Sequence, residues 1–171
     1  MYLVGIPVTS WLAQPGGVLE KATNAIVSAI TGESTSDRAV PALAALYLFW
    51  AFGATGAFSA AGQAMSRQEG LDSNCPRQHL SQMRGLPLRL FSAHSNLMET
   101  FPSFAVAAGL TQALAPNNQT LVNLIGLHVI AKVFVYYPMY LIDIPPPRTF
   151  SHVFSIAAVL NVCWRLARGA S

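Results

Sequence analysis

Charged side chains are scarce in this chain of 171 residues, in which Asp, Glu, Lys and Arg make up 10% of the sequence. A typical soluble domain carries about 25% charged residues, and 53% of this chain is apolar, so we expect lipid to surround much of the fold. Disorder is excluded, because it requires low hydrophobicity. The net charge of +3 comes from scattered residues without a basic run, which argues against nucleic-acid binding.

Cysteine and the common catalytic motifs are also scarce or missing. Cys75 and Cys163 are the only cysteines, so the sequence supports neither a disulfide framework nor a cysteine-ligated metal site. It contains no HExxH, P-loop or GxSxG pattern, which argues against zinc peptidase, phosphoryl-transfer and serine hydrolase chemistry. His94 and His128 each stand among apolar neighbours, so we interpret them as structural residues and expect no metal.

What is present is a series of long apolar stretches, which predict an all-α membrane protein. A spanning helix needs roughly 20 predominantly apolar residues. Between Arg38 and Arg67, 28 residues carry no charge, and this stretch contains the first predicted span. Because helices satisfy every backbone polar group internally, we expect a bundle of four transmembrane helices. The predicted spans are residues 40–64, 86–114, 121–142 and 149–166.

Two parts of the chain are therefore expected: an extension over 1–38 and a membrane domain over 39–168. Apolar residues at helical spacing within 18–30 predict a short helix, either lying on the membrane surface or packed on the rest of the protein. The connection 66–87 contains Arg67, Arg77 and Arg84, so the positive-inside rule places it in the cytoplasm. The N-terminus then lies on the opposite side, although Arg165 and Arg168 argue against this orientation.

Ionisable residues inside the predicted spans indicate a functional site, because each costs roughly 2.5 to 3.5 kcal/mol in the membrane. In the second span, residues at positions i, i+3, i+4 and i+7 are predicted to share one helix face: Ser92, Ser95, Asn96 and Glu99. His94 falls on a different face. At a similar depth on the third and fourth spans we expect Lys132, Tyr136, Arg148, Thr149 and His152.

These groups predict a polar pocket in an apolar bundle. The alternative is that Glu99 pairs with Lys132 or Arg148 and only joins the helices.

The polar segment of the second span resembles a known signature. Residues 92–102, which read Ser-Ala-His-Ser-Asn-Leu-Met-Glu-Thr-Phe-Pro, are similar to the Arg-Ala-His-x-Asn-x-x-Glu pattern of the MAPEG proteins. These are membrane-associated proteins in eicosanoid and glutathione metabolism. Asn74-Cys75-Pro76-Arg77 resembles the Asn-Pro-Arg stretch before the second helix, and Pro147-Arg148-Thr149 resembles the opening of the fourth. The resemblance covers about residues 40–168.

The resemblance implies a homotrimer of four-helix subunits with glutathione between neighbours and a lipophilic substrate entering from the bilayer. Asn96 and Glu99 match contacts to the glutathione peptide, while Arg148 matches the arginine beside the thiolate, a charge that a nearby cation favours. Ser92 and Ser95 stand where members have arginines, Lys132 replaces an arginine, and His152 stands where a tyrosine is frequent. The candidate glutathione-binding residues are Ser92, Ser95, Asn96, Glu99, Lys132, Arg148 and Thr149; the candidate catalytic residues are Glu99, Tyr136, Arg148 and His152.

Three functions follow from these patterns. The first is a membrane enzyme with glutathione-dependent transferase, peroxidase or isomerase chemistry on a lipophilic small molecule, in the endoplasmic reticulum if the cell is eukaryotic. The second is a divergent member without glutathione that isomerises or cyclises a hydrophobic biosynthetic intermediate, with His152, Tyr136 and Glu99 as acid and base groups. The third is a non-catalytic membrane subunit of a biosynthetic complex, in which related chains form a hetero-oligomer.

Overall fold

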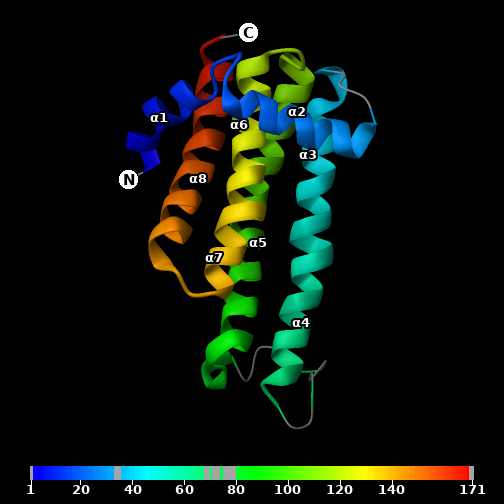
Figure 1. The fold of residues 1–171 in the computed structure, drawn as a ribbon, viewed down its shortest axis with the longest axis vertical. Helices are drawn as coiled ribbons and strands as arrows, with labels where there is room; N and C mark the ends of the chain where they lie inside the picture. The colour runs from blue at the N-terminus through cyan, green and yellow to red at the C-terminus, as the bar shows by residue number, and fades with distance from the viewer. Residues whose placement is uncertain (1, 33–35, 68–69, 71–73, 75–79, 170–171) are drawn as a thin grey trace.

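Four long helical segments run side by side along the long axis of the molecule (Figure 1). The structure is a computed structural model that describes residues 2–32, 36–67, 70, 74 and 80–169. The first segment consists of α3 (Ala39–Leu48), η3 (Phe49–Ala54) and α4 (Thr55–Met65), and the second is α5 (Gly85–Leu114). The third consists of α6 (Gln119–Ile130), η5 (Ala131–Tyr136) and α7 (Tyr137–Leu141), and the fourth is α8 (Pro145–Ala167).

The predicted bundle of four membrane helices is confirmed. Among the described residues, the segments 39–65, 119–141 and 145–167 are long and apolar enough to cross a membrane. The fourth member, α5, is the longest helix at 30 residues, but it carries Arg89, His94, Asn96 and Glu99 and is therefore less apolar. The protein is thus a multi-pass integral membrane protein whose four spans include one markedly polar helix.

Proline and asparagine determine where two of the helices begin. The prediction that the fourth span begins at Thr149 was wrong, because α8 already starts at Pro145. Its first turn contains three prolines, which fit there because the first N–H groups of a helix have no intrahelical partner. At the start of α6, the Asn118 side chain accepts a hydrogen bond of 3.1 Å from the Leu121 backbone N–H, so this helix begins at Gln119.

Two of the spans contain a wide π-helical turn, η3 in the first and η5 in the third. Such turns are rare and are frequently found at functional sites. The two turns are close to each other, since the ring of Trp50 at η3 lies 5.4 Å from that of Tyr137, which follows η5. η5 carries both Lys132 and Tyr136, so the irregular turn coincides with the polar residues of the third span.

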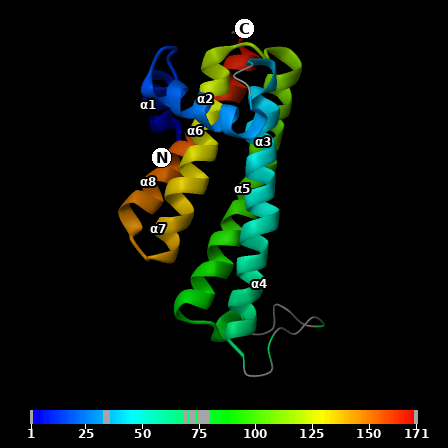
Figure 2. The same ribbon diagram turned by 45° about the vertical axis from the view of Figure 1, so that its right-hand side comes forward.

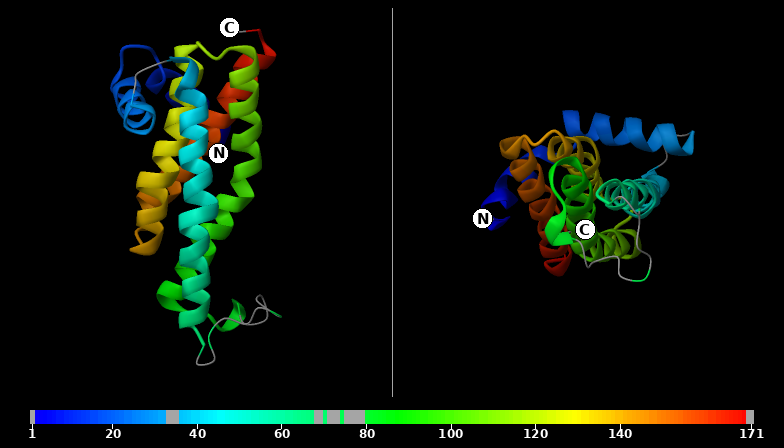
Figure 3. Two further views of the ribbon diagram at one scale, coloured as in Figure 1. Left: turned by 90° about the vertical axis from the view of Figure 1, so that its right-hand side faces the viewer. Right: turned by 90° about the horizontal axis from the view of Figure 1, so that it is seen from below.

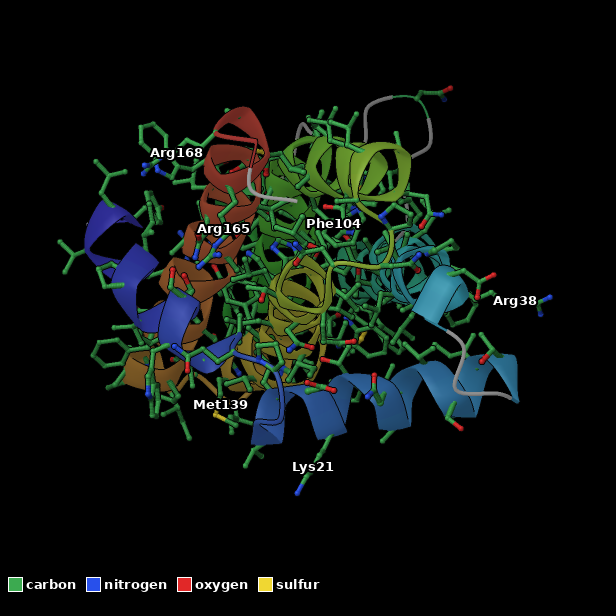
Figure 4. The ribbon with its side chains drawn as sticks, turned by 90° about the horizontal axis from the view of Figure 1, so that it is seen from above. Lys21, Arg38, Phe104, Met139, Arg165 and Arg168 are labelled. Carbon is green, nitrogen blue, oxygen red and sulfur yellow. The ribbon has the colours of Figure 1, made fainter. Side chains whose placement is uncertain are left out.

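Aromatic rings fill the centre of the bundle. The ring of Tyr47 on α3 lies 4.7 Å from that of Phe104 on α5 and 5.0 Å from that of His128 on α6. Phe104 stacks on His128 at 4.8 Å, and Figure 4 shows Phe104 in the interior of the bundle. The Nδ1 atom of His128 lies 3.0 Å from the Ser155 carbonyl oxygen, so this buried ring joins α6 to α8.

The residues before the bundle form helices that pack on its sides. η1 (Tyr2–Val4) and α1 (Gly5–Leu12) lie along α8, whereas α2 (Val18–Thr31) crosses α6 and α3 near the end opposite the α7–α8 turn (Figures 1 and 2). Figure 3 shows that α4 and α5 extend past that turn. The short helices η2 (Ser36–Arg38) and η4 (Leu80–Gln82) precede α3 and α5. The extension is therefore helical and attached to the bundle.

For residues 18–30 we considered a helix on the membrane surface and a helix packed on the rest of the protein, and α2 has features of both. It packs on the bundle through Thr23 and Val27, and a side chain at Gly126 on α6 would overlap the Thr23 side chain. Most of the apolar residues predicted to share its face remain exposed: Val18, Ala22, Ala25, Ala29 and Ile30. Lys21 extends away from the molecule (Figure 4). α2 is therefore held by a narrow contact and leaves most of its apolar face available to lipid.

Candidate functional site

A buried lysine lies at the centre of a polar cluster inside the bundle. Lys132 on η5 has no exposed surface, and its Nζ donates a hydrogen bond of 3.2 Å to Asn96 Oδ1 on α5. The same Nζ lies 2.9 Å from His152 Nδ1 on α8 and 4.4 Å from the centre of the Tyr136 ring. The structure thus brings together Asn96, Lys132, Tyr136 and His152, which the sequence analysis placed at similar depth.

A second group of polar residues lies at the turn between α7 and α8. Arg148 packs over the Tyr140 ring at 4.7 Å, and its Nη1 lies 3.8 Å from an Asp143 carboxylate oxygen. Arg89 on α5 approaches the other oxygen of Asp143 at 3.9 Å and donates from Nε to the Leu141 carbonyl oxygen at 2.8 Å. Asp143 therefore holds two guanidinium groups together, and its own φ of 60° places it in the left-handed region.

A groove of about 600 Å³ runs between α4 and α5. It is lined by Gln63 of α4 and by His94, Ser95 and Glu99 of α5, among other residues. Sequence analysis had placed His94 on a different face from Ser95 and Glu99, and this prediction was wrong. His94, Ser95 and Glu99 stand at positions i, i+1 and i+5, which span about 140° around the helix axis. α4 is wide enough to border all three. Asn96 lies beyond this sector and contacts the lysine instead.

Glu99 does not pair with a cation. Its side chain is exposed in the groove, and in the described part of the chain no basic group lies within 4.0 Å of its carboxylate. Lys132 is occupied by Asn96 and His152, and Arg148 by Asp143. Among the described residues of the single chain, Glu99 therefore forms no direct ion pair with Lys132 or Arg148 of the kind that the alternative requires.

His94 has a defined hydrogen-bonding role in the same groove. Its Nδ1 lies 3.0 Å from Thr55 Oγ1, and the Thr55 hydroxyl donates to the Ala51 carbonyl oxygen. The hydroxyl proton is already used, so Nδ1 of His94 must donate and its Nε2 is left as an acceptor. The sequence interpretation of His94 as a purely structural residue missed this groove-lining imidazole.

The remaining predicted site residues lie apart from these contacts. Ser92 is half-buried on α5 and Thr149 is exposed in the first turns of α8; neither hydroxyl has a hydrogen-bond partner in the described ranges. Tyr136 lies between the lysine cluster and the turn, because its ring is 5.8 Å from that of His152 and 5.5 Å from that of Tyr140, over which Arg148 packs. Asn96 of the lysine cluster follows Ser95 of the groove on α5. The lysine cluster, the turn and the groove thus form neighbouring parts of one polar region.

Comparison with known proteins identifies the domain that carries this region. A sequence model of the MAPEG family matches residues 39–168, which is well over half of the chain. The chain belongs to the MAPEG family. No curated protein and no solved structure matches it. The MAPEG match begins with α3, so α1 and α2 lie outside the matched region. Of the segments that resembled MAPEG motifs, Cys75, Pro76 and Arg77 lie outside the described residues.

One residue in contact with this polar region comes from outside the matched region. The hydroxyl oxygen of Tyr2 lies 3.2 Å from His152 Nε2, and the two rings meet edge to face at 6.0 Å. Sequence analysis missed Tyr2, because no motif or spacing in residues 1–38 relates it to the fourth span. Across the residues that the structure describes, no three His, Cys, Asp or Glu side chains gather as a metal site.

Proposed function

We propose that this MAPEG protein is a membrane enzyme that acts on a lipophilic small molecule with glutathione as its thiol cosubstrate. The observation that carries the proposal is the exposed carboxylate of Glu99, which no described basic group approaches within 4.0 Å and which lies in a groove beside the lysine cluster. A free carboxylate at membrane depth is costly, so it calls for a cationic partner. The ammonium group of glutathione supplies one.

The groove and its neighbours fit the rest of glutathione. A volume of about 600 Å³ lies within the usual range of small-molecule sites. Asn96 accepts from Lys132 through Oδ1, so its Nδ2 amide is left to donate to a carbonyl or carboxylate of the peptide. Arg148 is half-buried, and its guanidinium can share its donors between Asp143 and an anion. Ser95 adds a hydroxyl group to the groove itself, whereas Ser92 lies outside the groove lining and Thr149 follows Arg148 in sequence.

Glutathione would supply a nucleophilic sulfur: the thiol gives its proton to water, the thiolate attacks an electrophilic carbon of the lipophilic substrate, and the leaving group departs with the electron pair of the broken bond. In this scheme Arg148 stabilises the thiolate electrostatically, since a preorganised cation favours the charged form of the sulfur. Glu99 and Asn96 orient the peptide, and Lys132 orients Asn96. Phe91 and Met98 also line the groove and give an apolar surface to the second substrate. We further propose a homotrimer, with the α7–α8 turn on the cytoplasmic side and, in a eukaryote, residence in the endoplasmic reticulum.

Glutathione binding to the purified protein in nanodiscs tests the proposal. Binding is measured by calorimetry, and turnover is measured with a generic electrophile such as 1-chloro-2,4-dinitrobenzene. Arg148→Ala and Glu99→Gln each remove a charged hydrogen bond worth about 1.5 to 3 kcal/mol, so each should weaken binding or turnover about 10- to 150-fold. Arg168→Ala, just beyond the opposite end of α8, is the matched control and should change neither. No binding at millimolar glutathione would refute the proposal.

A second function is favoured by the lysine cluster itself. Lys132, His152 and Tyr136 are within reach of one another and could move a proton without any thiol. This arrangement suits isomerisation or cyclisation of a hydrophobic biosynthetic intermediate. Here, turnover of a lipophilic substrate should persist when glutathione is removed and should be lost in His152→Ala. If neither His152→Ala nor Arg148→Ala affects the cell's product, the protein is a non-catalytic subunit of a biosynthetic complex.

A further inference from the structure

The segment 2–12 is attached to α8 by specific contacts. Gly5 lies so close to α8 that a Cβ at this position would be 2.7 Å from Ala157 Cβ. Asn161 donates from Nδ2 to Thr9 Oγ1 at 3.1 Å and to Ser10 Oγ at 2.9 Å. Small residues that allow close approach, together with hydrogen bonds between helices, are the usual means of helix association in membranes. The position of Tyr2 relative to α8 is therefore fixed by the packing of α1.

Through Tyr2, a series of polar contacts extends across four helical elements. Tyr2 Oη lies 3.2 Å from His152 Nε2, His152 Nδ1 lies 2.9 Å from Lys132 Nζ, and Lys132 donates to Asn96 Oδ1 at 3.2 Å. These residues belong to η1, α8, η5 and α5. His152 lies in the middle of this series and has a contact on each of its two ring nitrogens. These two contacts together define which nitrogen carries the proton.

The chemistry of the groups determines which atom donates and which accepts in each of these hydrogen bonds. The ammonium group of Lys132 can only donate, so His152 Nδ1 accepts its hydrogen bond. A neutral imidazole that accepts at Nδ1 carries its proton at Nε2 and donates from there. The acceptor for that proton is the hydroxyl oxygen of Tyr2. With the other tautomer, the Nδ1 proton would face the ammonium group of Lys132 and Nε2 would have no proton to donate.

We propose that Tyr2 is a positioning residue of the polar site: its hydroxyl oxygen accepts the Nε2 proton of His152, so Tyr2 and Lys132 together hold the ring in the orientation in which Nδ1 accepts from Lys132. The segment 2–12, which lies outside the family match, is then part of the functional site. The inference rests on the proposed function only in treating His152 as a site residue. The protonation pattern itself is a property of the protein without substrate.

Nitrogen NMR of the full chain, labelled with ¹⁵N-histidine in nanodiscs, tests the proposal without glutathione or substrate. In the wild type we expect His152 to show a protonated Nε2 and an unprotonated Nδ1. In Tyr2→Phe the acceptor is lost while Lys132 still donates to Nδ1, so the Nε2–H signal should weaken and change its chemical shift. Trp11→Phe is the matched control, because Trp11 is an exposed aromatic residue on α1, and it should leave the His152 signals unchanged.

A second variant tests the same contact while leaving the Tyr2 side chain unchanged. Asn161→Leu removes the hydrogen bonds that hold α1 on α8, so it should give the same change at His152 as Tyr2→Phe. His94 and His128 report folding, since their signals should stay constant in every variant. The proposal is overturned if the Nε2–H signal of His152 is the same in the wild type, Tyr2→Phe and Asn161→Leu. Because no glutathione is present, that outcome is separate from failure of the proposed function.

Discussion

The contact between Lys132 and Asn96 gives the sharpest energetic prediction. Lys132 is fully buried, whereas in an unfolded state within the membrane its long side chain can reach the aqueous interface. Asn96→Leu leaves the ammonium group with one acceptor fewer. A hydrogen bond to a charged group is worth about 1.5 to 3 kcal/mol, so the free energy of unfolding should fall by about this amount. Hydrogen bonds between membrane helices average only about 0.6 kcal/mol, but Lys132 is charged and packed inside the protein.

A double-mutant cycle isolates this contact. In the Lys132→Met background the ammonium group is gone, so adding Asn96→Leu should cost little, because replacing both partners of a buried pair is close to neutral. The expected coupling energy between the two positions is therefore about 1.5 to 3 kcal/mol. It is measured by reversible unfolding in mixed micelles with increasing SDS, followed by circular dichroism.

Asn123 provides the control for the cycle, because it is a buried amide on the same span and hydrogen-bonds elsewhere, to the Ala13 carbonyl oxygen at 3.1 Å. It lies about 13 Å along the helix from Lys132 at 1.5 Å per residue. Substitutions at that separation usually add, so Asn123→Leu and Lys132→Met should show no coupling beyond about 0.5 kcal/mol. A coupling of that small size between Asn96 and Lys132 would refute the reasoning.

The other predictions concern different parts of the fold. Gly126→Val should push α2 away from α6 through the Thr23 contact, and limited proteolysis should then cleave within or beside α2 while the bundle stays intact. Asp143→Asn should cost less than about 1 kcal/mol, because the carboxylate is largely exposed, and 1 M salt should produce the same change in thermal stability in the wild type but none in the variant. Phe104→Ala should destabilise the bundle by about 3 to 5 kcal/mol in SDS titration, since it empties the space between Tyr47 and His128.

The bundle could be predicted from the sequence because lipid imposes a simple rule. The charge-free stretch between Arg38 and Arg67 and the three later apolar stretches each correspond to an observed helix. The depth of Lys132 relative to Asn96 and His152 was also predictable, since a rise of 1.5 Å per residue converts sequence position into height. The family followed from the same region, because its motif lies on the polar face of α5.

The neighbour that each side chain faces was harder to predict than the depth of that side chain in the membrane. Depth depends on position along one helix, but a face is defined by which neighbour covers it, and α4 borders His94 as well as Ser95 and Glu99. The roles of Tyr2 and Asp143 depend on contacts with residues distant in sequence or on a turn geometry without a motif. Neither kind of information is present in the periodicity of a single sequence.

The wide turn η5 holds one residue more than an ordinary turn of the same span. Its hydrogen bonds join residues i and i+5, whereas those of an α-helix join residues i and i+4. If one residue between Lys132 and Tyr136 were deleted, the turn could tighten to an ordinary α-helix, and the helix after it would keep nearly its present direction. What the deletion would remove is the local widening of the backbone beside Lys132. In this protein the shape of one helical turn therefore belongs to the polar site as much as the side chains it carries.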